Sequence, residues 1–178
     1  MHLNPIKGAF PHKDQHDRTA VVAVGSEKIE RGSVIRVNSN GEFEIAPNAD
    51  IFPMFLALQG YKDLQATMAG FFGQGVGPVV DPDKPVSKGP AISGIHMDDG
   101  DVWETDMFDV DVADSAWTIN AKLTVKNGLI TVAAPEGNDN VIGYLVKGPT
   151  FRYINNAPTA SGTMTGESRR VIQFQCGR

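Results

Sequence analysis

Apolar and polar residues alternate in short runs along most of the chain, which is the pattern of β-strands with one buried side. In residues 42–46, Phe43 and Ile45 alternate with two glutamates. Thr19–Val24 is a β-branched run that fits a buried strand. Further strands are predicted at 33–37, 91–96, 107–112, 117–125, 129–133 and 169–176. These short strands predict a mainly antiparallel β fold, built as a barrel or a sandwich.

Two segments have the pattern of β-hairpins with Asn-Gly turns, at Asn40-Gly41 and at Asn127-Gly128. Asn-Gly supplies the positive φ angles that tight hairpin turns need. The strings VNSNGEFEIAP and VKNGLITVAAP around these turns are alike, and an apolar segment that ends at a glycine follows each. They suggest an internal duplication with a period of 87 residues, counted from Asn40 to Asn127. Chance similarity is the alternative, because Asn-Gly turns recur in many β proteins.

The chain divides by composition into four parts. Residues 1–18 form a polar N-terminal arm, 19–69 a first β half, 70–90 a connector and 91–178 a second β half. The connector holds five glycines and four prolines, which mark turns and loops. Apolar residues at helical spacing predict one short helix at about 61–70, so at most one or two short helices are expected in all.

Length and charge narrow the class of protein. The 178 residues have a mass of 19.1 kDa, enough for one ordinary domain or two small lobes. Sixteen basic residues against 21 acidic ones give a net charge of −5, so the basic footprint of a nucleic-acid or anionic-membrane binder is missing. The longest apolar run, Ile51–Leu58, is far shorter than a membrane-spanning helix. We therefore expect a soluble protein with neither a nucleic-acid nor a membrane partner.

The single cysteine and the N-terminal sequence bear on the compartment. Cys176 has no partner for an intrachain disulfide, which suggests synthesis in a reducing compartment. Its place in an alternating segment near the C-terminus predicts a packing role rather than a nucleophile. The first 18 residues contain no apolar stretch of the kind found in secretory signals.

Two segments carry side chains that could bind a metal ion. His12, Asp14, His16 and Asp17 lie close together, but they match no spacing on a rigid element. A solvated or partner-binding arm is therefore the favoured interpretation, with no metal. The second segment, 98–114, holds eight carboxylates and no lysine or arginine. We interpret it as a solvated face, with an ion site or a contact for a basic partner as alternatives.

Within that acidic segment, strand alternation over 107–112 would place Asp109 and Asp111 on the solvent side. Trp103 and Trp117 could stack on a sugar, but a β core is the favoured place for them. The glycine-rich stretch 70–77 lacks the lysine and hydroxyl residue of a phosphate loop. No segment combines a nucleophile, a base and an orienting group, so we predict a protein without catalytic activity or cofactor. A hydrolase with dispersed catalytic residues is a further alternative.

Several strings resemble the small structural proteins that decorate the heads of tailed bacteriophages. They are Trp103–Asp109 (WETDMFD), Leu123–Ile130 (LTVKNGLI), Asn140–Leu145 (NVIGYL) and Arg31–Gly41 (RGSVIRVNSNG). The resemblance covers about residues 20–60 and 100–148. The chain departs from a minimal member in residues 61–99 and in the 30 residues after Gly148.

This resemblance implies a decoration (cement) protein, often trimeric, that is made in the host cytoplasm and binds the major capsid protein on the outside of the head. It carries over no active site. We assign the N-terminal arm a share of the shell contact through Ile6, Phe10, His12 and His16, because this polar segment has apolar anchors and no strand pattern. The alternative function is a β-rich ligand-binding module for carbohydrate or a divalent cation.

Overall fold

The computed structural model describes residues 3–7, 17–26, 28–50, 53–58, 91–134, 140–155 and 166–177. These residues form eleven strands and one 3₁₀ turn, η1 (Asp114–Ala116). The strands are β1 (Leu3–Lys7), β2 (Asp17–Val21), β3 (Val34–Val37), β4 (Phe43–Ile45), β5 (Met54–Ala57), β6 (Ala91–His96), β7 (Val102–Thr105), β8 (Lys122–Lys126), β9 (Leu129–Val132), β10 (Gly143–Asn155) and β11 (Gly166–Cys176).

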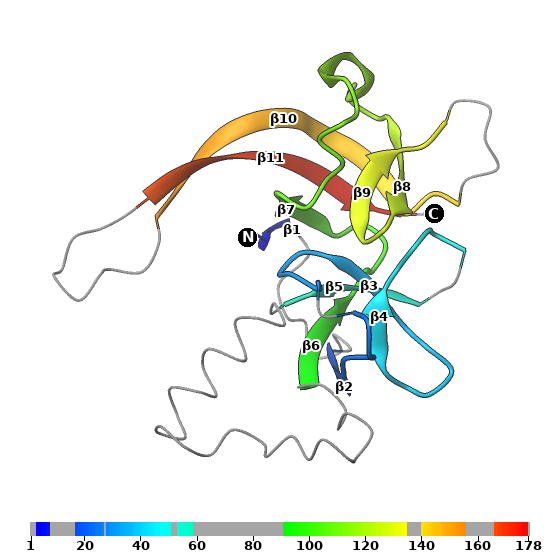
Figure 1. Cartoon of the computed structure of the whole chain (residues 1–178). Coiled ribbons are helices and arrows are strands. Elements are labelled where there is room, and N and C mark those ends of the chain that lie inside the picture. Colours follow the sequence, from blue (N-terminus) through cyan, green and yellow to red (C-terminus); the bar gives the residue numbers. More distant parts are fainter. Residues whose placement is uncertain are drawn as a thin grey trace, which may run out of the picture.

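The strands form two antiparallel sheets (Figure 1). The six-stranded sheet has the order β1-β7-β11-β10-β8-β9, and the five-stranded sheet has the order β2-β6-β5-β3-β4. The predicted mainly antiparallel β fold is confirmed in its sandwich-like form. Within the described residues, no helix is long and apolar enough to cross a membrane.

Both sheets contribute to one hydrophobic core. From the six-stranded sheet, Trp103, Leu145 and Phe174 are at most 2% exposed, and Val34 and Leu56 of the five-stranded sheet lie in the same cluster. Alternate residues of each strand supply these side chains, as expected where one sheet face packs on another. The two sheets are therefore held together by a shared core.

The five-stranded sheet curls around a second core of its own. Ile35, Phe43, Phe55 and Ile92 pack there, on the opposite side of the strands from the shared core. The curl brings Val22, just after β2, into a single parallel bridge with Phe43 of β4. One bridge does not make a ladder, so the sheet does not close into a barrel.

Both predicted Asn-Gly hairpins are confirmed, but their turns differ. In β8–β9, Asn127 and Gly128 form a two-residue turn with φ angles of 49° and 78°. In β3–β4, only Gly41 of the dipeptide has a positive φ, 80°. The side chain of Asn38 orders that longer turn, because its Oδ1 accepts from the backbone N–H groups of Asn40 (2.9 Å) and Glu42 (3.0 Å). The duplication itself stays a prediction.

The two predicted halves of the chain do not correspond to the two sheets. β1, from the predicted N-terminal arm, joins the six-stranded sheet beside β7. β6, which follows the predicted connector, pairs with β2 and β5 in the five-stranded sheet. The chain therefore passes from the six-stranded sheet to the five-stranded sheet between β1 and β2, and returns between β6 and β7. The predicted helix at 61–70 and the connector lie outside the described residues.

Two predicted strands are wrong in extent. Of residues 107–112, only Phe108 forms a bridge, to Ile130, and the following residues turn. In the predicted strand 117–125, pairing begins at Lys122, because η1 and a turn occupy the preceding residues. In the first of these segments alternation predicted a strand, yet the Asp109 side chain accepts from the Asp111 N–H, a local bond that favours a turn instead.

Candidate functional site: the projecting β10–β11 ribbon

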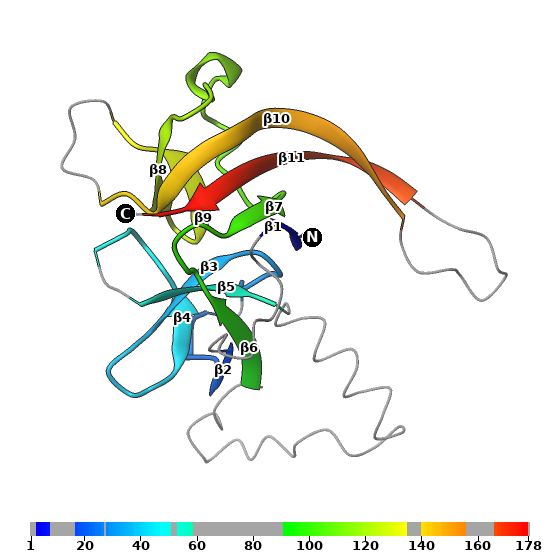
Figure 2. The same ribbon diagram turned by 180° about the vertical axis from the view of Figure 1, so that it is seen from behind.

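The two longest strands, β10 and β11, extend beyond the body of the protein as a curved ribbon (Figures 1 and 2). They pair from Gly143 with Cys176 out to Asn155 with Gly166. Near the body, β7 borders residues 172–175 of β11, and β8 borders the first two residues of β10. Past these contacts, among the described residues, the strands pair only with one another. We call residues 149–155 and 166–171 the distal ribbon.

Local sequence explains where the ribbon leaves the body. The β10 register shifts between Leu145 and Lys147 and again before Thr150, and such bulges bend a strand. Gly148 lies against the backbone of Trp117, where a Cβ atom would be only 3.0 Å from the Trp117 carbonyl oxygen. Pro149 follows within the second register shift, where the ladder is interrupted and a proline is tolerated.

One face of the distal ribbon carries two exposed aromatic rings. Phe151 is 72% exposed and Tyr153 is 68% exposed. In register they face Arg170 and Ser168 of β11. Since side chains alternate along a strand, these residues share a face with Ile172 of the shared core. The two rings thus continue the core-facing side of the sheet past the point where the body covers it.

The opposite face carries two arginines directly across from each other, Arg152 and Arg169. Like charges in this position repel, but each arginine meets a carboxylate. Arg152 Nε lies 2.9 Å from Glu104 Oε2, and Arg169 Nη1 lies 2.6 Å from Asp106 Oδ2. Glu104 Oε2 also accepts from Gln173 Nε2 at 2.8 Å. We call Arg152, Arg169, Glu104 and Asp106 the clasp.

Burial makes the clasp more than a surface ion pair. The Glu104 side chain is 1% exposed and that of Asp106 is 9% exposed. A carboxylate with so little access to water depends on charged and hydrogen-bonding partners in the protein. A third arginine, Arg170, donates to Asp114, and its guanidinium carbon lies 5.8 Å from the Phe108 ring centroid. The Asp114 side chain is 74% exposed, so this ion pair lies at the surface, unlike the clasp.

These contacts correct the interpretation of the acidic segment 98–114 as a solvated face. The arginines of the ribbon neutralise part of it within the same chain. Asp109, predicted to face solvent, is instead 4% exposed. Lys126 Nζ lies 3.0 Å from Asp109 Oδ2 and Thr131 Oγ1 lies 3.4 Å from it, while the Asp111 N–H donates to Oδ1. Burial acts to raise the pKa of Asp109, but these bonds together outweigh it and lower the pKa.

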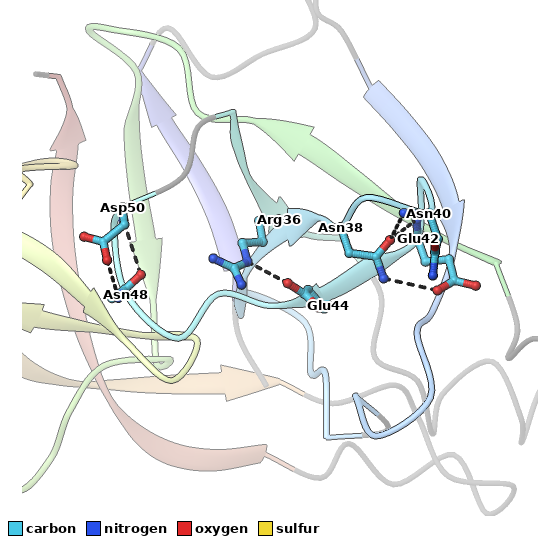
Figure 3. Close-up of polar contacts among 7 residues, drawn as sticks. All are labelled: Arg36, Asn38, Asn40, Glu42, Glu44, Asn48 and Asp50. Carbon is cyan, nitrogen blue, oxygen red and sulfur yellow. Dashed lines mark hydrogen bonds and ion pairs between the residues drawn. The ribbon is translucent and has the colours of Figure 1, made fainter.

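A second polar group lies on the β3–β4 hairpin (Figure 3). Arg36 Nε donates to Glu44 Oε1 at 2.7 Å across the two strands, and Asn38 Nδ2 donates to Glu42 Oε2 at 3.1 Å. Next to the hairpin, Asn48 contacts Asp50. Cross-strand pairs of this kind stabilise a hairpin, and we assign them that role.

The sequence-predicted contact residues are only partly described. Ile6 lies in β1 and is 39% exposed. Phe10, His12 and His16 lie outside the described residues. No group of three His, Cys, Asp or Glu side chains that could hold a metal ion occurs in the part of the chain that the structure describes.

Three other predicted residues are buried. Trp103 and Trp117 are 2% and 5% exposed, so both belong to the core as expected and neither offers a stacking platform. Cys176 is buried beside the acidic turn that precedes β7, and burial raises the pKa of its thiol. A protonated, inaccessible thiol agrees with the predicted packing role.

Comparison with known proteins gives no match: no family model, no curated protein and no solved structure is similar to the chain. The functional assignment therefore depends on the motifs of the sequence and on the ribbon. Sequence reasoning missed Phe151 and Tyr153, although the alternating residues after Pro149 carry a strand signal.

Proposed function

We propose that this chain is a virion structural protein that binds the outside of an assembled phage head and stabilises it, without catalysis. The resemblance of its Trp103–Asp109, Leu123–Ile130 and Asn140–Leu145 strings to head decoration proteins suggests this role. The observation that supports it most is the projecting ribbon with its two exposed aromatic rings.

A surface of this kind suits contact with a larger assembly. Exposed aromatic side chains are frequent anchors of protein interfaces, because they bury much apolar area with little loss of side-chain freedom. A two-stranded ribbon is only marginally stable alone in water. A shell that covered Phe151 and Tyr153 would bury both rings and stabilise the distal ribbon at the same time.

The stabilising effect would follow from differential affinity. A protein that binds assembled shell more tightly than free capsid subunits shifts the equilibrium toward the shell. Several copies joined in a symmetric oligomer, such as the trimer that the resemblance implies, would present several ribbons at once and raise the effective concentration at the shell. Light scattering on the purified protein measures this oligomeric state.

The test mixes the purified protein with matched empty heads and measures co-sedimentation and the heat resistance of the heads. We expect the wild-type protein to bind and to protect. We expect Phe151→Ser and Tyr153→Ser each to weaken binding at least tenfold, about the loss of one interface anchor. Ile119→Ser is the matched control, since Ile119 is 72% exposed but lies outside the ribbon.

Equal binding by all three variants would show that the ribbon takes no part in the contact with the shell. Absence of binding by the wild-type protein, combined with saturable binding of Ca²⁺ or of a member of a glycan panel, would instead favour the ligand-binding module. The N-terminal contact needs point substitutions, Ile6→Ser and Phe10→Ser. Deleting residues 1–16 would also remove β1 from its sheet and confuse folding with binding.

A further inference from the structure

We propose that the clasp of Arg152 and Arg169 with Glu104 and Asp106 sets the direction of the distal ribbon, and so places Phe151 and Tyr153 for their contact. The direction of the ribbon is a property of the free protein. Its consequence for shell binding rests on the proposed function.

The register places the clasp where it can act on the bend of the ribbon. Arg152 faces Arg169 across the ribbon, whereas Glu104 of β7 faces Gln173 of β11. These two levels are four residues apart along β11, which in a straight strand is about 13 Å. The 2.9 Å contact between Arg152 Nε and Glu104 Oε2 therefore draws the distal ribbon back toward the body.

The charges favour this contact. Without Glu104 and Asp106, two guanidinium groups would face one another across two strands that pair, among the described residues, only with each other. Without the arginines, two carboxylates with at most 9% exposure would each lose a cationic partner. Each side therefore gains a partner of opposite charge from the other, and the link joins the body at β7 to the distal strands.

The clasp lies on the face opposite Phe151 and Tyr153, so its residues can be changed without altering the aromatic surface. Substitutions in the clasp therefore test the direction of the ribbon while leaving unchanged the aromatic side chains that would make the contact. Arg170 and Asp114 form the matched control, because that pair is on the aromatic side of the ribbon and Asp114 is largely exposed. Exposed pairs contribute little.

The experiment measures the distance distribution between spin labels at Ser168→Cys on the ribbon and Lys122→Cys on β8, in the free protein. Cys176 is 2% exposed and stays unlabelled. We expect a single narrow distribution in the wild-type background, a broad and shifted one with Arg152→Gln or Arg169→Gln, and no change with Asp114→Asn. Amide exchange in the distal ribbon should accelerate at least about tenfold in the two arginine variants, as expected from the loss of one charge-assisted hydrogen bond.

The exchanged pair Arg169→Asp with Asp106→Arg should recover the narrow distribution. Circular dichroism separates a moved ribbon from an unfolded body. Folded arginine variants with wild-type distances and wild-type exchange would overturn the proposal. A loosened ribbon that still binds heads with wild-type affinity would overturn its role in the contact. Failure of the wild-type protein to bind heads would refute the proposed function alone, since the distances test the clasp independently.

Discussion

At the scale of single residues, Asp109 links the acidic segment to the β8–β9 hairpin through Lys126 and Thr131. Its pKa lies below the ordinary value of 3.8 in the folded protein. A lowered folded pKa stabilises the fold at pH values above the unfolded pKa, and this contribution is lost as the pH falls through the folded pKa. We expect Asp109→Asn to lower the free energy of unfolding by about 1–3 kcal/mol at pH 7.

Urea denaturation at several pH values checks this. The difference between wild type and Asp109→Asn should shrink below about pH 4, as the wild-type carboxyl becomes protonated. Asp111→Asn is the control, because Asp111 is exposed and contributes only its backbone N–H to Asp109. A difference that stays constant down to pH 2 would mean that the charge of Asp109 does not stabilise the fold.

The chemistry of single residues was enough to predict the burial of some side chains but not of others, for physical reasons. Trp103 and Trp117 could be placed in the core because large aromatic side chains bury much apolar area. Asp109 could not, because burial of a carboxylate depends on partners such as Lys126 and Thr131, which follow it by 17 and 22 positions in the chain. The same holds for Glu104, whose partner Arg152 lies in a strand that the sequence did not predict.

At the scale of elements, β1 ties the start of the chain to the six-stranded sheet. Leu3 is 3% exposed in the shared core, and its carbonyl oxygen accepts from Arg31 Nη2 at 3.0 Å. Ile6 of the same strand is 39% exposed. We expect Leu3→Ala to lower the free energy of unfolding by about 2–3 kcal/mol and Ile6→Ala by less than about 0.5 kcal/mol.

Chemical denaturation measures both changes. Equal and small effects of the two substitutions would show that β1 is not held in the sheet, and would restore the expectation of an unpaired arm. The comparison also decides how the N-terminal contact can be studied, because an Ile6 variant that folds normally reports on binding alone.

Elements were predictable where local chemistry decides them. The Asn-Gly turns identified both hairpins, since few other dipeptides accept their backbone angles. β10 was missed because Gly148 and Pro149 signal a break, and only pairing with β11 carries the strand through that point. β1 was missed because its five residues include Pro5, which is tolerated only at an edge such as the one that β1 occupies.

At the scale of the whole molecule, the two Asn-Gly hairpins contact each other and join the sheets. The backbone N–H of Gly128, in the β8–β9 turn, donates to the Ala46 carbonyl oxygen at 2.7 Å. The Gly128 carbonyl oxygen accepts from the Val34 N–H at 2.9 Å. No sequence pattern marks this contact, because it depends on how the five-stranded sheet curls. The two sheets are therefore joined by these backbone hydrogen bonds as well as by their shared core.

Gly128 is therefore a sensitive test of how the sheets fit together. Its φ is +78°, and a Cβ atom there would lie 2.8 Å from Ile45 Cγ2 of the facing hairpin. Gly41 has nearly the same φ, +80°, and no atom within 4 Å of such a Cβ. We expect Gly41→Ala to cost about 1–2 kcal/mol of unfolding free energy, the backbone penalty alone. Gly128→Ala should cost about 1–3 kcal/mol more, because the added methyl group overpacks the contact.

Tryptophan fluorescence and far-UV circular dichroism during urea denaturation give both values. Trp103 and Trp117 lie in the shared core, whereas Ile45 packs against the core inside the five-stranded sheet. If the hairpin contact joins the sheets into one cooperative unit, both signals should shift by the same amount in Gly128→Ala. Equal costs at the two glycines would show that the contact carries no strain. Separate transitions for the two signals would show that the sheets unfold independently, and that the shared core alone does not couple them.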